Sequence, residues 1–150
     1  ETAREKAAKS GLNVEGQDFG VPFVKSPAFD VAICFEVLEH LFNPEILLQS
    51  LNQSLAHKGT LVVTVPNVAF WRRRARLLLG RFNPLGSPDT AFAAPWRDPH
   101  IRFFTAQTLC DLVVASGFEN PKILGLDGWA SRKIPSLFST HLAVIAAKNS

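Results

Sequence analysis

The chain has 150 residues and 47% of them are hydrophobic, including twelve Phe and three Trp, so it can fill the core of one domain and is not a disordered chain. Its formal net charge of +3 is modest, so the chain as a whole is neither strongly basic nor strongly acidic. No apolar run approaches the roughly 20 residues that cross a bilayer, and the first ten residues lack the apolar stretch of a secretory signal, so we expect a cytoplasmic protein.

The first expected elements are a helix and two strands. Thr2 to Ser10 contains good helix formers, and Gly11 is a natural residue to end that helix. Leu12 to Gln17 is then a short strand candidate that ends at Asp18. Phe29 to Phe35 is a nearly continuous apolar run, which predicts a buried strand of a parallel sheet.

A helix, a turn and a further strand are expected next. Pro44 to Leu55 carries apolar residues with a spacing compatible with one helix face. The His-Lys-Gly sequence at 57–59 predicts a turn out of that helix. Leu61 to Val65 is apolar and rich in β-branched residues, and Pro66 is expected to end the strand.

The middle of the chain predicts a lid or insertion at about residues 70–99. It starts with a basic helix at 71–81, WRRRARLLLGR, which carries five Arg residues and no acid. Gly and Pro then recur among the aromatic residues Phe82, Phe92 and Trp96, so regular structure is interrupted while apolar anchors remain. The arginine run suits an anionic substrate, a membrane surface or RNA, and a solvated helix face explains it equally well.

The last third predicts one helix and two strands. Thr105 is of a residue type that caps helices, the helix runs to Ser116, and Gly117 closes it. Ile123 to Leu126 and His141 to Lys148 are the last strand candidates, and the short connection between them predicts an antiparallel pair at the sheet edge. The alternation of strands and helices predicts an α/β fold.

Three polar side chains, Glu36, Glu39 and His40, follow the strand that ends at Phe35. If this segment is helical, spacings of three and four residues place both carboxylates and the imidazole on one face, at the carboxyl end of the strand. Such a group suits Mg²⁺ or Mn²⁺, with His100 as a candidate fourth ligand from across the lid. Two other interpretations stay open, namely His40 as a general base and a purely structural group.

Four segments together carry a family resemblance: FDVAICFEVLEHL at Phe29 to Leu41, KGTLVVTVPN at Lys58 to Asn67, HIRFFT at His100 to Thr105 and LVVASGF at Leu112 to Phe118. In this order they resemble the class I S-adenosylmethionine-dependent methyltransferases. The similarity is closest to the group that includes ubiquinone-pathway O-methyltransferases and methyltransferases of glycan and secondary-metabolite gene clusters. It implies a Rossmann-like fold, a mostly parallel sheet with an antiparallel edge strand, and S-adenosylmethionine as the cofactor.

One part of the family's pattern is missing from the sequence. Family members begin with a strand, a glycine-rich loop that holds the methionine part of the cofactor, and a second strand ending in an acid that binds the ribose. By that layout residues 1–150 match the C-terminal two thirds of one domain, without its first two strands. Either the chain is a fragment, which we favour, or it is a short chain that cannot bind the cofactor in the family's way. A fragment would expose apolar sheet edges and is expected to fold poorly or associate.

The resemblance also implies roles for residues of the cofactor site. Asp18 matches an acid that accepts a hydrogen bond from the adenine amino group, with Phe19 beside the ring. Phe35 matches a residue that lines the cofactor near its sulfur. The structural alternatives are an ordinary turn for the Asp and an ordinary core position for Phe35.

A metal and the methyl acceptor are the remaining expectations from the resemblance. In similar quinone O-methyltransferases and small-RNA 2′-O-methyltransferases, four positions hold a divalent metal that binds the acceptor hydroxyls and lowers their pKa. Those positions match Glu36, Glu39, His40 and His100. The candidate acceptor contacts are Asn67, Trp71 and His100, and the candidate catalytic residue is His40.

Three functions fit the sequence. The first is an enzyme that methylates a small-molecule acceptor, most readily at oxygen, and the apolar lid favours it. The second is a metal-assisted RNA 2′-O-methyltransferase, ranked lower because no aromatic module that stacks single-stranded bases is evident. The third is a non-catalytic partner domain that kept the fold and lost the donor site, which the missing glycine-rich loop supports.

Overall fold

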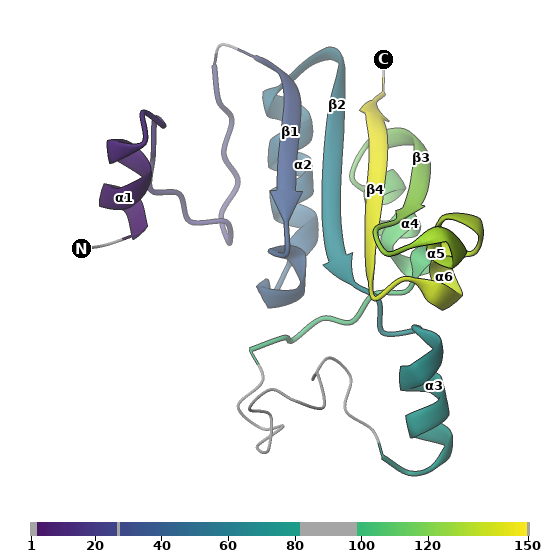
Figure 1. The fold of residues 1–150 in the computed structure, drawn as a ribbon. Coiled ribbons are helices and arrows are strands. Elements are labelled where there is room, and N and C mark those ends of the chain that lie inside the picture. The colour runs from purple at the N-terminus through teal and green to yellow at the C-terminus, as the bar shows by residue number, and fades with distance from the viewer. Residues whose placement is uncertain (1–2, 27, 82–98, 150) are drawn as a thin grey trace.

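A four-stranded sheet with the order β1-β2-β4-β3 forms the centre of the molecule (Figure 1). In this computed structural model, which describes residues 3–26, 28–81 and 99–149, β1 spans Phe29–Phe35 and runs parallel to β2, Leu55–Pro66. β4, His141–Lys148, is antiparallel both to β2 and to the edge strand β3, Phe118–Gly125. The predicted α/β fold and the antiparallel pair at the edge are confirmed. The strand of opposite direction is β4, which lies one place in from the edge.

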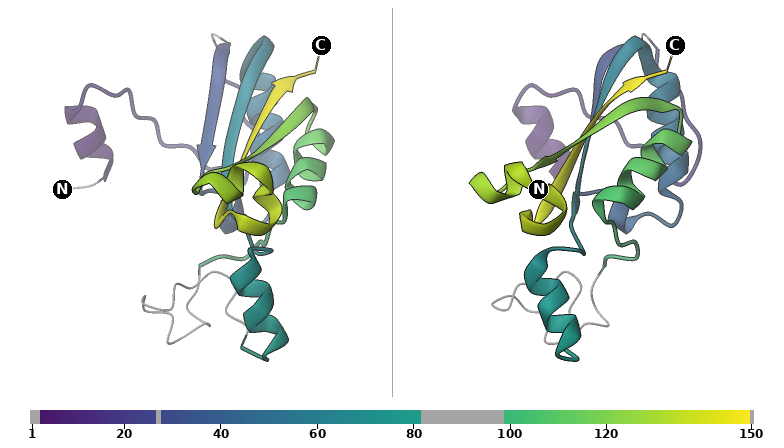
Figure 2. Two further views of the ribbon diagram at one scale, coloured as in Figure 1. Left: turned by 45° about the vertical axis from the view of Figure 1, so that its right-hand side comes forward. Right: turned by 90° about the vertical axis from the view of Figure 1, so that its right-hand side faces the viewer.

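Two helices cover one face of the sheet, as Figure 2 shows. They are α2, Pro44–Ser54, and α4, Ala106–Ala115, both predicted from the sequence. Thr105 caps α4 through a reciprocal pair of hydrogen bonds with Thr108, the arrangement called a capping box. The predicted first helix, α1, spans Ala3–Lys9 and lies apart from the sheet. The core between the sheet and these two helices includes Leu48, Leu61, Leu109, Val113 and Leu142.

The sequence 57–59 lies inside β2 and does not form the predicted turn. The pairing of β1 with β2 shifts between Phe29 and Val31, so the additional residues of β2 are accommodated as a bulge. Lys58 adopts a φ of 61° at this point, and a Cβ on Gly59 would lie 2.9 Å from a backbone carbonyl oxygen. The predicted turn is wrong because residues that favour a turn also favour a bulge. Here they form a bulge, and β2 continues through it.

The strand predicted at 12–17 is also wrong, because these residues have no regular structure. The chain that follows is held by helix α2. The backbone N–H of Phe23 donates to the Ser50 hydroxyl at 3.1 Å, and that of Lys25 donates to the Ser54 hydroxyl at 2.9 Å. These hydrogen bonds hold the segment before β1 against a helix, so it does not pair with the sheet.

The face of β1 that points away from α2 is open. The alternate side chains Phe29, Val31, Ile33 and Phe35 are between 49% and 62% exposed. A strand of a doubly covered sheet is apolar on both faces, which is the pattern that this strand has. The apolar side chains on this face of β1 are therefore suited to be covered, and the described chain leaves them about half exposed.

The remaining elements lie around the end of the sheet where β1 and β2 finish. A single 3₁₀ turn, η1, spans Leu38–His40 directly after β1. Helix α3, Trp71–Leu78, follows β2 and extends away from the sheet (Figure 1). Two short helices, α5, Trp129–Lys133, and α6, Pro135–Phe138, connect β3 to β4.

The lid predicted at about 70–99 falls partly outside the described chain. Its first part is helix α3, whereas Phe82, Phe92 and Trp96 belong to residues 82–98, which the structure does not describe. None of the described helices is long and apolar enough to cross a membrane.

Candidate functional site

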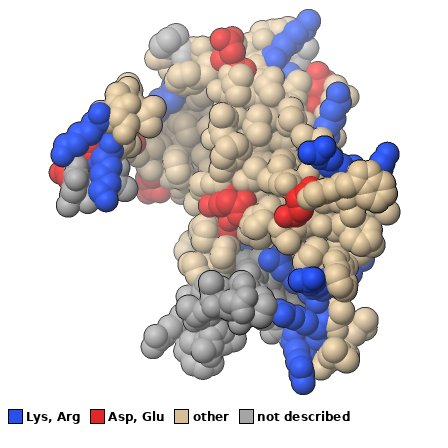
Figure 3. Space-filling view, in the orientation of Figure 1, with Lys and Arg blue, Asp and Glu red and all other residues tan. Residues whose placement is uncertain are grey.

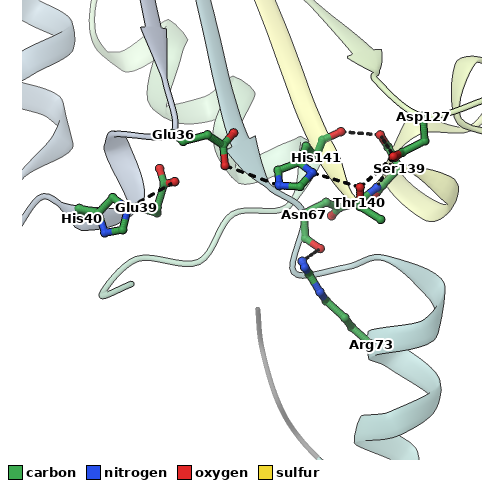
Figure 4. A network of polar contacts seen from close by, with 9 residues as sticks. All are labelled: Glu36, Glu39, His40, Asn67, Arg73, Asp127, Ser139, Thr140 and His141. Atoms are coloured by element: carbon green, nitrogen blue, oxygen red, sulfur yellow. Dashed lines mark hydrogen bonds and ion pairs between the residues drawn. The ribbon is translucent and has the colours of Figure 1, made fainter. Parts of the chain in front are cut away.

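Polar side chains gather where β1 and β2 end and β4 begins (Figure 4). The carboxyl ends of the parallel strands and the amino end of the antiparallel strand meet at one edge, as the pairing of Pro66 with His141 shows. Residues far apart in the sequence therefore share this edge of the sheet. They form two groups, one around Glu39 and one around His141.

The first group consists of Glu39, His40 and His100. One ligand atom from each residue lies within 4.8 Å of the others. Glu39 is only 1% exposed, and neither of its carboxylate oxygens has a hydrogen-bond partner among the described residues. The rings of His40 and His100 are stacked with their centroids 4.6 Å apart. Because a buried carboxylate without a partner is costly, this group requires a proton or a cation beside Glu39.

The tautomer of His40 follows from its contacts. Its Nδ1 lies 3.2 Å from the carbonyl oxygen of Pro99, which can only accept, so Nδ1 carries a proton and donates it. Its Nε2 lies 3.8 Å from Oε1 of Glu39. In the neutral imidazole Nε2 has a lone pair, so two electron-pair donors face each other. That arrangement is typical of a metal ligand whose second nitrogen is fixed by a backbone carbonyl.

The environment of Glu39 raises the pKa of its carboxyl group above the ordinary value. Desolvation by burial is the largest cause and the nearby charge of Glu36 adds to it, whereas the backbone N–H of Glu39 and the two imidazoles act in the opposite direction. In the absence of a cation, the protonated form of Glu39 is therefore favoured more than it is in water.

Glu36 does not join this group, although the sequence spacing predicts one shared face. It adopts a left-handed backbone conformation with a φ of 51°, and the 3₁₀ turn starts only at Leu38. The i, i+3 geometry of a helix therefore does not apply between Glu36 and Glu39. Instead, Oε2 of Glu36 lies 3.7 Å from Nε2 of His141. Of the four predicted metal ligands, the structure brings three together.

The second group centres on His141, to which the sequence assigns no role. Nδ1 of His141 lies 3.1 Å from the Thr140 hydroxyl, which is within 2.9 Å of Oδ1 of Asp127. The Asp127 carboxylate also accepts hydrogen bonds from the Ser139 hydroxyl and from the Thr140 backbone N–H. The sequence contains one signal for this group, which is the antiparallel direction predicted for the last strand. That direction places the first residue of the strand, His141, at the same edge as Glu36.

Asp127 has a pKa below its ordinary value. Desolvation is the largest single influence and would raise the pKa. It is outweighed by hydrogen bonds from the backbone and hydroxyl of Thr140 and from Ser139, together with the nearby charge of His141. The carboxylate therefore stays ionised and holds the turn that leads into β4.

Asn67 holds the end of β2 in place. Its side chain is 0% exposed, and its amide NH₂ donates to the carbonyl oxygens of Ser139 at 2.8 Å and Ser136 at 3.1 Å. Its side-chain oxygen accepts from the N–H of Ala69 at 3.0 Å. The predicted acceptor contact Asn67 thus lies beneath the surface of the edge, whereas Trp71 is 44% exposed on helix α3.

A hollow of about 110 Å³ lies beside the end of β1. Phe19 and Phe35, both predicted to contact the cofactor, lie among its lining residues, which are otherwise Ile33, Cys34, Val37, Leu47 and Leu51. Asp18 precedes Phe19, and its Oδ1 accepts a hydrogen bond from the Gly20 N–H at 2.8 Å, which fixes the turn. The mostly apolar lining suits the face of a flat ring.

A family model described as a methyltransferase domain matches residues 2–123. The chain belongs to this family of methyltransferase domains. The match spans most of the described chain, including the 3₁₀ turn with Glu39 and His40. No curated protein sequence matches the chain.

Solved structures of methyltransferases share the fold. A SAM-dependent methyltransferase of Thermotoga maritima is 18% identical with a TM-score of 0.70, and the match covers 97% of this chain and 68% of that one. A SAM-dependent methyltransferase of Archaeoglobus fulgidus is 16% identical with a TM-score of 0.59, over 96% of this chain and 71% of that one. A small RNA methyltransferase is 18% identical with a TM-score of 0.55, over 83% of this chain and 14% of that one.

At these identities the likeness concerns the fold, and the family match supplies the activity class. This methyltransferase domain therefore has the Rossmann-like fold of its family, with S-adenosylmethionine as the methyl donor. The domain spans about two thirds of the length of the first two neighbours.

Proposed function

We propose that this methyltransferase domain transfers a methyl group from S-adenosylmethionine to an oxygen atom of a small-molecule acceptor. The observation that supports this most is the facing pair of Glu39 and His40, in which Oε1 of the buried carboxylate lies 3.8 Å from Nε2 of the imidazole. Such a pair can bind the hydroxyl group of an acceptor directly, or can bind a cation that holds the hydroxyl. His100, stacked on His40, completes the acceptor side.

The donor is proposed to bind at the hollow beside β1. Phe19 and Phe35 line that hollow, and both lie near the edge where Glu39 is found. The sulfonium of the donor already activates the methyl group, so the protein has to align the acceptor oxygen and accept its proton. His40 is the proposed base, because its Nε2 has a lone pair that can accept the proton of the acceptor hydroxyl.

A divalent metal fits the same three residues. With Glu36 directed to His141, the donor set is one carboxylate and two imidazoles, which suits Mn²⁺ better than Mg²⁺, whose preferred ligands are oxygen atoms. Glu39, His40 and His100 would hold the ion, and the ion would lower the pKa of an acceptor hydroxyl. Asn67 would keep β2 and the turn before β4 in position, and Trp71 stays a proposed acceptor contact.

Two alternative functions are compatible with the same fold. An RNA 2′-O-methyltransferase would use the same cluster, with the arginines of α3 placed to meet phosphates. A non-catalytic partner domain would keep the fold without binding the donor. Both alternatives differ from the main proposal in what they bind, so binding experiments distinguish them.

We also propose that the open face of β1 is covered in the whole protein by further structure of the same domain. The alternate residues of β1 on that face are apolar and about half exposed, which is unfavourable in a monomer. The domain would then correspond to the C-terminal two thirds of a complete methyltransferase domain. Size-exclusion chromatography tests this: residues 1–150 alone should associate, and a monodisperse monomer would contradict the proposal.

The decisive experiment is calorimetric titration of S-adenosylhomocysteine into the full-length gene product. We expect micromolar binding, roughly −8 kcal/mol, and no binding by a well-folded protein would overturn the enzyme proposal. Incubation with a deuterium-labelled methyl donor and an extract of small molecules, followed by mass spectrometry, would then identify the acceptor atom. Label found only in RNA would favour the second function.

A further inference from the structure

None of the residues of helix α3 is buried. Within the described chain it is held at its start, where the Arg73 guanidinium donates to the carbonyl oxygen of Asn67 and Nε of Arg74 donates to that of Ala69. From that point the helix extends away from the sheet, as all the views in Figures 1 and 2 show. Because Asn67 is fully buried at the end of β2, the start of the helix has a fixed position.

The apolar face of α3 is exposed to solvent. At 3.6 residues per turn, Trp71, Ala75 and Leu78 fall on one face. Leu78 is 88% exposed and Trp71 is 44% exposed. Arg73, which is tethered to Asn67 and half-buried, lies on the opposite face. An amphipathic helix of a globular protein normally packs its apolar stripe against the core. The exposed stripe of α3 is therefore suited to contact an apolar surface outside the core.

Arginine side chains accompany this stripe. Arg72 lies on one side of it and Arg74 on the other, both exposed, and the guanidinium of Arg72 lies 5.3 Å from the centre of the Trp71 ring. The sequence 71–81 contains no acidic residue that would neutralise them. Figure 3 shows Lys and Arg side chains gathered along α3.

We propose that α3 binds to the surface of an anionic lipid bilayer. A helix that combines a cationic polar face with a narrow face of Trp and Leu is suited to lie in the plane of a membrane interface. The arginines pair with lipid phosphates, while Trp71 and Leu78 enter the boundary between headgroups and acyl chains. The neighbouring Leu79, 74% exposed, extends the apolar contact.

A bilayer explains the exposed side chains better than RNA does. Phosphates of RNA would satisfy the arginines, but they offer nothing to an exposed leucine. Trp71 is also a proposed acceptor contact, whereas Leu78 and Leu79 take no part in the proposed donor or acceptor sites, so a change at Leu78 tests the membrane proposal separately from the methyltransferase function. A membrane-bound domain would have access to acceptors that partition into lipid.

The test is sedimentation of the full-length protein with vesicles. We expect it to sediment with vesicles of equal parts phosphatidylglycerol and phosphatidylcholine, and to stay in solution with phosphatidylcholine alone. Leu78→Ser should weaken the partition at least about tenfold, because a buried leucine is lost. Arg72→Gln with Arg76→Gln should weaken it about 30-fold at low salt.

Matched controls come from elsewhere in the chain. Leu12→Ser removes another exposed leucine, and Lys6→Gln with Lys122→Gln removes the same charge away from α3. Both controls should change the partition by no more than about twofold. Leu12 lies outside α3, and the lysine charges are screened from a bilayer bound at α3 when they lie beyond a Debye length. Failure to sediment with anionic vesicles would overturn the proposal. So would a partition that the arginine changes abolish but Leu78→Ser leaves intact, since α3 would then be attracted to the vesicles by charge alone, without insertion of its apolar face.

Discussion

Nε2 of His40 lies 3.8 Å from Oε1 of Glu39, and Nδ1 of the same ring donates to the backbone at Pro99. The backbone bond fixes which nitrogen carries the proton, and the burial of Glu39 removes water from its carboxylate. An exposed imidazole and a carboxylate that solvent does not reach are thereby held close together. The pair is satisfied by a proton, by a divalent ion or by an acceptor hydroxyl, and the following experiments separate these cases.

Replacing Glu39 by Gln should remove metal binding. The carboxylate is the only anionic ligand in the three-residue group, so we expect the Kd for Mn²⁺ to rise at least about 100-fold. Calorimetric titration of Mn²⁺ and Mg²⁺ into the metal-free protein would measure this. Glu45→Gln is the control, because Glu45 is a partly exposed residue of α2 whose carboxylate accepts a hydrogen bond from the Gln49 amide. Equal Mn²⁺ affinity in both variants would refute the site.

The pH dependence of stability should also depend on Glu39. Because burial raises the pKa of Glu39 in the folded state, the folded protein binds a proton that the unfolded chain has released. This contribution is present below the ordinary pKa and is lost as the pH rises through the raised one. The free energy of unfolding of the metal-free protein should therefore fall with rising pH relative to Glu39→Gln. Urea denaturation across this pH range, in the presence of a chelator, measures it, and parallel curves would contradict it.

Asn67→Ala should destabilise the protein by about 2–3 kcal/mol. Two backbone carbonyl oxygens and one N–H lose their partner in a fully buried position. Asn52→Ala is a matched control, since the Asn52 amide makes one hydrogen bond, to the Gly117 carbonyl oxygen, at 2.7 Å. That change should cost about 1 kcal/mol. Urea denaturation gives both values, and a smaller loss for Asn67 than for Asn52 would contradict its role at the end of β2.

Asp127→Asn should be less stable than the wild type, and the difference should shrink in acid. The hydrogen bonds from Thr140 and Ser139 outweigh desolvation and lower the pKa of Asp127 in the folded state. Its contribution is therefore present above the ordinary pKa and is lost as the pH falls through the lowered one. Thermal unfolding near pH 7 and near pH 3 gives the comparison. A difference that grows towards low pH would exclude this network.

Cys34 should be almost unreactive in the folded protein. Desolvation, with a smaller effect of Glu39, raises its pKa to about 12, and its side chain is 5% exposed in β1. Cys110 is also free and only partly buried. A thiol reagent at pH 8 should therefore label Cys110 first, followed by mass spectrometry of the modified peptides. Equal labelling rates in the folded state would mean that β1 opens readily.

Local sequence patterns predicted several elements accurately. The apolar run from Phe29 to Phe35 is β1, and the residues from Thr105 to Ser116 form the capped helix α4. These elements succeed because a continuous apolar run, or a cap followed by a helix stripe, is a pattern within a few neighbouring residues. The expected burial of β1 is wrong for the described chain, because Cys34 is its one buried residue there. The strand at Leu12 to Gln17 fails for the opposite reason, since a strand exists only if another strand pairs with it.

The candidate site was predicted less completely. Glu39 and His40 could be chosen from the sequence because they directly follow a buried strand, and His100 from the family resemblance. The left-handed conformation of Glu36 could not be predicted, because Glu is not a residue type that favours it. The link between Glu36 and His141 depended on where the last strand lies in the sheet, which the residues around His141 do not encode.

The sequence by itself determined the class of fold, the order of β1, α2, β2, α4 and the last two strands, and the edge at which the candidate site lies, because each follows from short-range patterns of apolar and polar residues. Only the tertiary structure decided which side chains meet at that edge, how deeply Glu39 is buried, and that the apolar stripe of α3 faces outward. These properties depend on strand order, on one backbone conformation and on contacts between residues far apart in the chain, and long-range packing sets all three.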